Sequence, residues 1–98
     1  MRLPPELQQV SVIHDQDEAV STLSRALSTS GCHEQDARVL CALLMAKAAI
    51  VAVSEVTGEV VLGFHRIESP HRQRWFTVGA GGVNFVWETD DGDPVTLQ

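Results

Sequence analysis

The chain has 98 residues, of which 44% are hydrophobic and 20% charged, and its formal net charge is −6 at pH 7. This length predicts one domain, and the balance of apolar and charged residues is typical of a folded protein rather than a disordered one. The negative charge repels polyanions, which disfavours direct binding to nucleic acid or to an anionic membrane as the main activity.

The sequence also indicates a compartment. Residues 1–9 contain two prolines and a glutamate and lack the apolar segment of a signal peptide. The longest apolar stretch, residues 39–53, is interrupted by Lys47 and is too short to span a bilayer. Because Cys32 and Cys41 do not make a disulfide framework, we expect a reducing, cytoplasmic environment and no membrane among the partners.

The N-terminal half predicts helices. Residues 1–8 are expected to form an extended lead-in, and the β-branched positions within 10–13 a short strand. A helical part over residues 15–49 follows. Its first helix is predicted to begin at Asp15, because a glutamate three residues later completes the spacing of a capping box. Gly31 is expected to end that helix in a left-handed conformation.

The second predicted helix begins near residues 32–34 and is apolar at almost every position from Val39 onward. An exposed helix carries one apolar stripe, whereas a helix that is apolar nearly all round is buried. We therefore expect this helix at the centre of the core or in a subunit interface, with Leu40 and Leu44 close to Trp87. The same surplus of apolar surface predicts self-association as a homodimer.

A β part is predicted over residues 50–97. Residues 50–53 and a turn at 56–59 favour a β-hairpin, although a helix continuing to Ser54 also fits the pattern. The remaining strands and the edge segment are predicted at residues 60–64, 74–78, 83–88 and 94–97. Within 83–88, Val83, Phe85 and Trp87 alternate with three other residues and are expected to share the better-buried face. The sequence thus predicts an α+β fold in which two N-terminal helices pack on one face of an antiparallel β-meander of about four strands.

Three sequence patterns resemble ligand-binding motifs, but each is better explained by a structural role. The glycines within residues 79–82 precede a strand-like segment, which predicts a tight β-turn rather than a phosphate loop. Cys32 and Cys41 are too far apart, and lack the second pair that a structural zinc site needs. The aspartates within residues 90–93 lack the distal glutamate of an EF-hand. We therefore predict no catalytic residue, no cofactor and no metal ligand.

The most informative local feature is a basic and aromatic segment between residues 64 and 75. It contains three of the seven Lys and Arg residues and two of the four histidines. Guanidinium groups beside an aromatic ring suit phosphate, carboxylate or base stacking. A charged loop that offsets the acidic surface is the favoured explanation. The candidate contacts for an anion or a partner are Arg66, Arg72, Arg74 and Trp75.

In general profile, a very short acidic domain without a catalytic motif is similar to many phage-encoded or mobile-element inhibitors, such as anti-CRISPR, anti-restriction and toxin-immunity proteins. The likeness is one of size and charge and carries no residues over. It implies an inhibitor or regulator that occupies a basic site on a partner protein, with a nucleic-acid-processing complex as one candidate. The predicted partner-facing residues are Glu88, Asp90, Asp91 and Asp93, with Trp87 as an aromatic anchor.

Two alternatives stay open. The first is an anion- or nucleic-acid-binding module that uses the segment from Arg66 to Arg74. The second is a small homodimeric enzyme, which requires a concave pocket holding a histidine beside a carboxylate. No nucleophile or acid–base pair can be assigned from the sequence, so the prediction is a protein that is not an enzyme.

Overall fold

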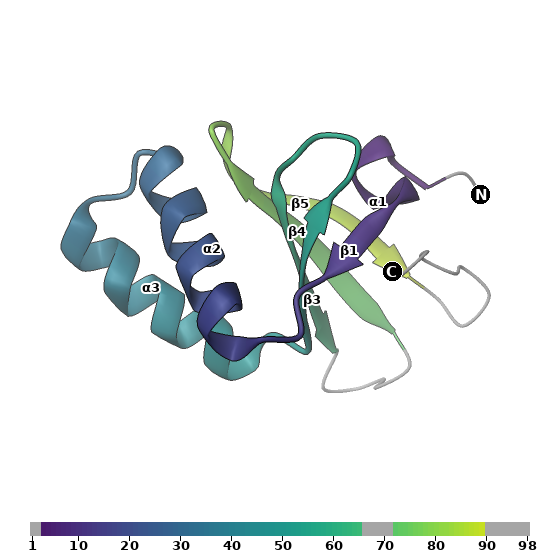
Figure 1. Cartoon of the computed structure of the whole chain (residues 1–98). Helices are drawn as coiled ribbons and strands as arrows, with labels where there is room; N and C mark the ends of the chain where they lie inside the picture. The colour runs from purple at the N-terminus through teal and green to yellow at the C-terminus, as the bar shows by residue number, and fades with distance from the viewer. Residues whose placement is uncertain (1–2, 66–71, 90–98) are drawn as a thin grey trace.

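The computed structural model describes residues 3–65 and 72–89. Figure 1 shows two longer helices beside one face of a twisted sheet, which confirms the predicted α+β arrangement. In the described part of the chain, no helix has both the length and the apolar character needed to cross a membrane. In chain order the elements are α1 (Pro5–Gln8), β1 (Val10–Val12), α2 (Gln16–Thr29), α3 (Glu34–Lys47), β2 (Ile50–Ser54), β3 (Val60–His65), β4 (Gln73–Gly79) and β5 (Gly82–Thr89).

The sheet is an antiparallel meander of five strands in the order β1-β2-β3-β4-β5. The N-terminal strand joins it by pairing with β2, with Val10 opposite Ser54. Strands β2 and β3 form the predicted hairpin, in which Gly58 adopts a φ of 77° and Ser54 N–H donates to the Glu59 carbonyl. The alternative in which the helix continues to Ser54 is therefore wrong. The predicted edge segment at residues 94–97 lies outside the described residues.

Helix α2 begins and ends where the sequence predicted. The Asp15 carboxylate accepts a hydrogen bond from the Asp17 N–H at 3.1 Å, which satisfies one of the free donors of the first turn. Gly31 has a φ of 91°, the left-handed conformation that ends a helix without steric cost for glycine. Between these ends, Leu23 and Leu27 are buried against the sheet because they recur at helical spacing.

Helix α3 does not occupy the centre of the core. It packs on α2 (Figure 1), and its buried residues are Ala37 and Cys41. Val39 and Leu43 are 61% and 54% exposed, although the sequence predicted them inside. The prediction of a central helix is wrong because one neighbouring helix can cover only one side of α3. The predicted position in a subunit interface stays a prediction.

The core is divided between the two faces of the sheet. The face that carries α2, here called the helix face, holds a cluster that includes Leu23, Leu27 and Leu62, against which Leu44 packs. The opposite face holds a second cluster, against which Trp87 packs. Leu44 and Trp87 therefore belong to opposite faces, and the predicted contact between them is wrong. The buried residues of the second cluster are Leu7, Val10, Ala52, Val61 and Trp75.

The second cluster is partly covered by α1, a four-residue helix at positions where the sequence predicted extended chain. Pro5 is the first helical residue, where its fixed φ suits the first turn and its missing N–H costs no hydrogen bond. The short helix places Leu7 in the core with no exposed surface. A four-residue segment is too short to form a stable helix by itself. The free energy gained by burying the Leu7 side chain compensates for this weak helix tendency.

Candidate functional site

The basic segment predicted to bind an anion is only partly described, and its described residues do not form an open cationic site. Arg74 lies opposite Glu88 in the β4–β5 pairing, and its Nε is 3.7 Å from the Glu88 Oε2. Arg72 is exposed and also makes an interaction. Arg66 lies outside the described residues. The sequence predicted that Arg74 binds an anion and that Glu88 contacts a basic partner. In the structure these two side chains instead form an ion pair with each other.

The two tryptophans lie on the face opposite α2 and form a cross-strand pair between β4 and β5. Trp75 is 1% exposed, so it does not offer its ring to a ligand in this fold. Its indole lies against Gly63 of β3, where a Cβ would come within 3.0 Å of Trp75 Cζ3. Trp87 is half-buried, and both indole N–H groups lack a hydrogen-bond partner among the described residues.

The remaining predicted contacts cannot be placed, because Asp90, Asp91 and Asp93 lie outside the described residues. The described histidines, His14, His33 and His65, are exposed on three separate segments: after β1, before α3 and at the end of β3. Within residues 3–65 and 72–89, no group of three or more His, Cys, Asp or Glu side chains could hold a metal ion.

The described residues also expose two sets of large apolar side chains. One set lies on the outer side of α3, and the other lies on β5, the edge strand of the described sheet. We call the two sets the apolar surface; it consists of Val39, Leu40, Leu43, Val83 and Phe85.

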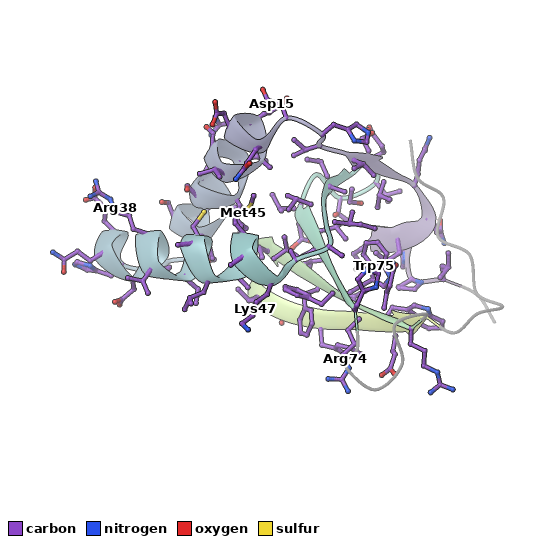
Figure 2. All side chains as sticks on the ribbon, turned by 90° about the horizontal axis from the view of Figure 1, so that it is seen from below. Asp15, Arg38, Met45, Lys47, Arg74 and Trp75 are labelled. Atoms are coloured by element: carbon purple, nitrogen blue, oxygen red, sulfur yellow. The ribbon has the colours of Figure 1, made fainter. Side chains whose placement is uncertain are left out.

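The two halves of the apolar surface are linked through partly buried residues. Phe85, Phe76 and Phe64 form a ladder of edge-to-face contacts across β5, β4 and β3, with ring centroids 5.5 and 5.6 Å apart. Phe64 and Leu44 pack against the same core cluster, and Leu40 lies one helical turn before Leu44. In Figure 2, the C-terminal end of α3 at Lys47 lies beside the sheet, whereas its other end at Arg38 projects away from it.

A β-bulge explains why the sequence did not reveal this surface. The register between β4 and β5 shifts next to Trp75 and Phe76, so that Trp75 faces Trp87 while Phe76 faces Phe85. Phe85 and Trp87 are therefore on opposite faces, and the expectation that they share one face is wrong. A bulge inserts one residue and inverts the alternation beyond it, and no pattern in a single strand announces its position.

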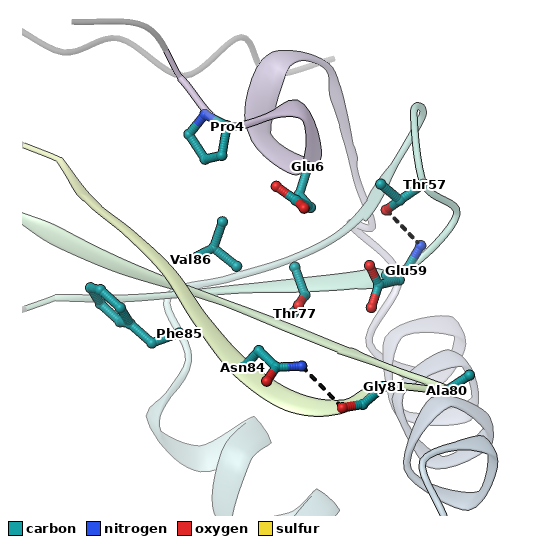
Figure 3. A pocket seen from close by; sticks show the side chains of 10 residues that line it. All are labelled: Pro4, Glu6, Thr57, Glu59, Thr77, Ala80, Gly81, Asn84, Phe85 and Val86. Atoms are coloured by element: carbon teal, nitrogen blue, oxygen red, sulfur yellow. Dashed lines mark hydrogen bonds between the residues drawn. The ribbon is translucent and has the colours of Figure 1, made fainter.

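A second feature is a pocket of about 710 Å³ at one end of the sheet, near α1 and the β4–β5 turn (Figure 3). Glu6 of α1, Glu59 of the β2–β3 loop and Thr77 of β4 project into it. The rest of its lining comprises Pro4, Thr57, Ala80, Gly81, Asn84, Phe85 and Val86. Phe85 thus contributes both to the pocket and to the apolar surface.

Comparison of the chain with protein-family models, with curated proteins and with solved structures found no match. The interpretation of the two surfaces therefore depends on their own geometry and chemistry.

Proposed function

We propose that this protein binds a partner protein and acts as its inhibitor or regulator, docking through the apolar surface. The observation that carries the proposal is the exposure of large apolar side chains, with Val39, Leu43 and Phe85 between 54% and 61% exposed. Single exposed apolar residues are ordinary, but several of them on the outer side of one helix are typical of interaction sites.

The negative charge of the chain favours a partner with a basic binding site. Asp36 lies in the first turn of α3 at one end of the apolar surface, Glu34 beside it pairs with Arg38 at 3.3 Å, and the whole chain carries a net charge of −6. A matching site has an apolar centre and a basic rim, because opposite charges across the rim speed association and reject wrong partners. This keeps the predicted basic binding site but moves the docking residues from the C-terminal aspartates to α3 and β5.

A second copy of the chain fits this surface less well. Two copies, each with a charge of −6, repel one another. The apolar surface consists of only five side chains, each between 37% and 61% exposed, whereas a stable interface uses about 20–30 residues on each side. A stable interface buries roughly 800 Å² on each partner. A heterologous partner can extend the contact onto residues beyond the surface described here.

The alternative of an anion- or nucleic-acid-binding module has less support from the described residues. Arg74 is paired with Glu88, and Trp75 is buried. The half-exposed ion pair is worth little energetically, so Arg74 could exchange partners. The buried tryptophan could not stack on a base without opening the sheet, and we therefore keep the protein-binding function as the conclusion.

The test compares two variants that each add one negative charge to α3. Leu43→Glu places the charge on the apolar surface, and Gln35→Glu places it at an exposed position outside that surface. Wild-type chain is used to capture a partner from the native host, and the partner is then purified. We expect Leu43→Glu to weaken binding of the purified partner by at least roughly tenfold, and Gln35→Glu by less than about twofold.

Light scattering of the wild-type chain completes the experiment. A monomer at high concentration, with a partner sensitive to Leu43→Glu, supports the proposal. A dimer that Leu43→Glu dissociates would instead assign the apolar surface to a second copy. Equal binding of a partner by both variants, or no partner recovered, would contradict docking through this surface.

A further inference from the structure

The pocket near α1 contains two carboxylates without a counter-charge. Glu6 and Glu59 are each half-buried, and neither forms an ion pair with any residue in the described ranges. A partly desolvated carboxylate attracts a cation more strongly than a fully hydrated one, since the local dielectric constant is lower. The pocket is therefore electrostatically suited to a positive group.

Thr77 provides an independent indication of a ligand. It is only 3% exposed, and its hydroxyl has no hydrogen-bond partner among the residues described. Figure 3 shows the Thr77 side chain pointing into the same space as the carboxylate of Glu59. The hydroxyl is not one of the fully buried polar atoms that lack a partner, so it keeps contact with the pocket and can accept a hydrogen bond from a donor that enters.

The positions of the other polar groups are defined by local contacts. Gly79 leaves room for the Glu59 side chain, because a Cβ at position 79 would lie 2.9 Å from the Glu59 Oε2. The Asn84 side-chain amide donates to the Gly81 carbonyl at 3.2 Å, which leaves the Asn84 carbonyl oxygen as an acceptor. Both groups are therefore in place before a ligand arrives.

We propose that this pocket binds the guanidinium group of an arginine side chain. Carboxylates, a hydroxyl and an amide oxygen are all acceptors, and a guanidinium presents five N–H donors in a plane and accepts none. Pro4 and Val86 line the same pocket and suit the apolar stem of an arginine.

A divalent metal ion matches the pocket less well than a guanidinium does. Calcium takes roughly six to eight oxygen ligands, whereas this lining offers two carboxylates and a few neutral oxygens beside an apolar wall. The inference goes beyond the proposed function, because the pocket is assigned a ligand whether or not a partner covers the apolar surface.

The first experiment titrates the full chain with N-acetyl-arginine methylamide and follows backbone amide signals by NMR. We expect saturable shifts at Thr57, Thr77 and Asn84, with a dissociation constant of about 1 mM, as befits a small ligand. Glu59→Gln should weaken binding by roughly five- to tenfold, because a charge-assisted hydrogen bond is lost. Glu18→Gln removes one charge from an exposed position on α2 and should leave binding within about twofold.

Further ligands separate the guanidinium from other cations. The citrulline analogue of the probe has nearly the same shape but no charge, so we expect no saturable shift with it. The lysine analogue should bind more weakly, and magnesium or calcium chloride should not compete. The proposal is overturned if citrulline binds as well as arginine, if lysine or a divalent cation binds more tightly, or if Glu59→Gln behaves as wild type.

A second variant protects the test against a local defect at Glu59. Glu6→Gln changes the opposite wall of the pocket and should also weaken arginine binding. Leu43→Glu should leave it unchanged, since that residue lies on α3 and does not line the pocket. If the chain binds its partner but not arginine, this inference fails and the proposed function stands. If the chain binds arginine but no partner, the proposed function fails and this inference stands.

Discussion

Helices α2 and α3 have the same length of 14 residues and follow one another in the chain, yet they are buried very differently. α2 has fewer apolar residues but directs Leu23 and Leu27 into the core with no exposed surface. α3 is richer in apolar residues but is anchored by Ala37 and Cys41. The comparison teaches that the arrangement of apolar residues around a helix, and not their number, determines how much the fold buries.

The difference follows from the layers of the fold. α2 lies between the sheet and α3, so its apolar stripe meets the sheet on one side and α3 on another. α3 has a neighbour on only one side, and its remaining apolar residues face outward (Figure 1). A helix that is apolar all round needs a partner on its outer side, which the described residues do not supply.

The largest expected effect separates the two helices directly. Leu23→Ala in α2 should lower the free energy of unfolding by about 2–5 kcal/mol, because it removes a fully buried side chain and leaves a cavity. Leu43→Ala in α3 makes the same chemical change at an exposed position and should cost less than about 0.5 kcal/mol. Urea unfolding followed by tryptophan fluorescence measures both values.

Equal losses of stability in the two variants would contradict the burial described for α3. A large loss in Leu43→Ala alone would indicate that α3 is covered in solution, as in a homodimer. Repeating the measurement at several protein concentrations distinguishes that case, because the stability of a dimer rises with concentration.

Local signals made much of the fold predictable. Asp15 and Gly31 mark the two ends of α2 through a side-chain hydrogen bond and a left-handed φ, both of which depend on residues close in sequence. The hairpin at Gly58 and the tight turn before Gly82 were predicted for the same reason, since glycine tolerates the positive φ found at both positions.

What could not be predicted depends on contacts between distant segments. The bulge beside Phe76 is a property of two paired strands, and it moves Phe85 to the helix face. The pocket joins Glu6, Glu59 and Thr77 from three parts of the chain, and their meeting requires the full topology. Sequence spacing identified acidic residues near the C-terminus, but it could not show which carboxylates share a cavity.

The next expected effect concerns the side of α3 that packs against α2. Ala37→Leu should lower the free energy of unfolding by about 1–3 kcal/mol, since the small residue is buried in the core cluster beside α2 and a larger one must displace its neighbours. Ala46→Leu, at an exposed position of the same helix, should change stability by less than about 0.5 kcal/mol. Calorimetry or urea unfolding gives both values, and a neutral Ala37→Leu would show that α3 is attached loosely.

The smallest expected effect concerns the starts of the two helices. α2 has a capping carboxylate in Asp15, whereas α3 begins after His33, which makes no side-chain cap although its backbone is extended as a cap requires. His33→Ser should therefore stabilise the start of α3 by about 0.5–1 kcal/mol, because the serine hydroxyl can accept from a free N–H of the first turn. Since α3 is anchored on one side only, the gain should be clearest in hydrogen exchange of the amides in its first turn. His33→Ala is the control, and equal exchange in the two variants would mean that capping does not limit the stability of this end of α3.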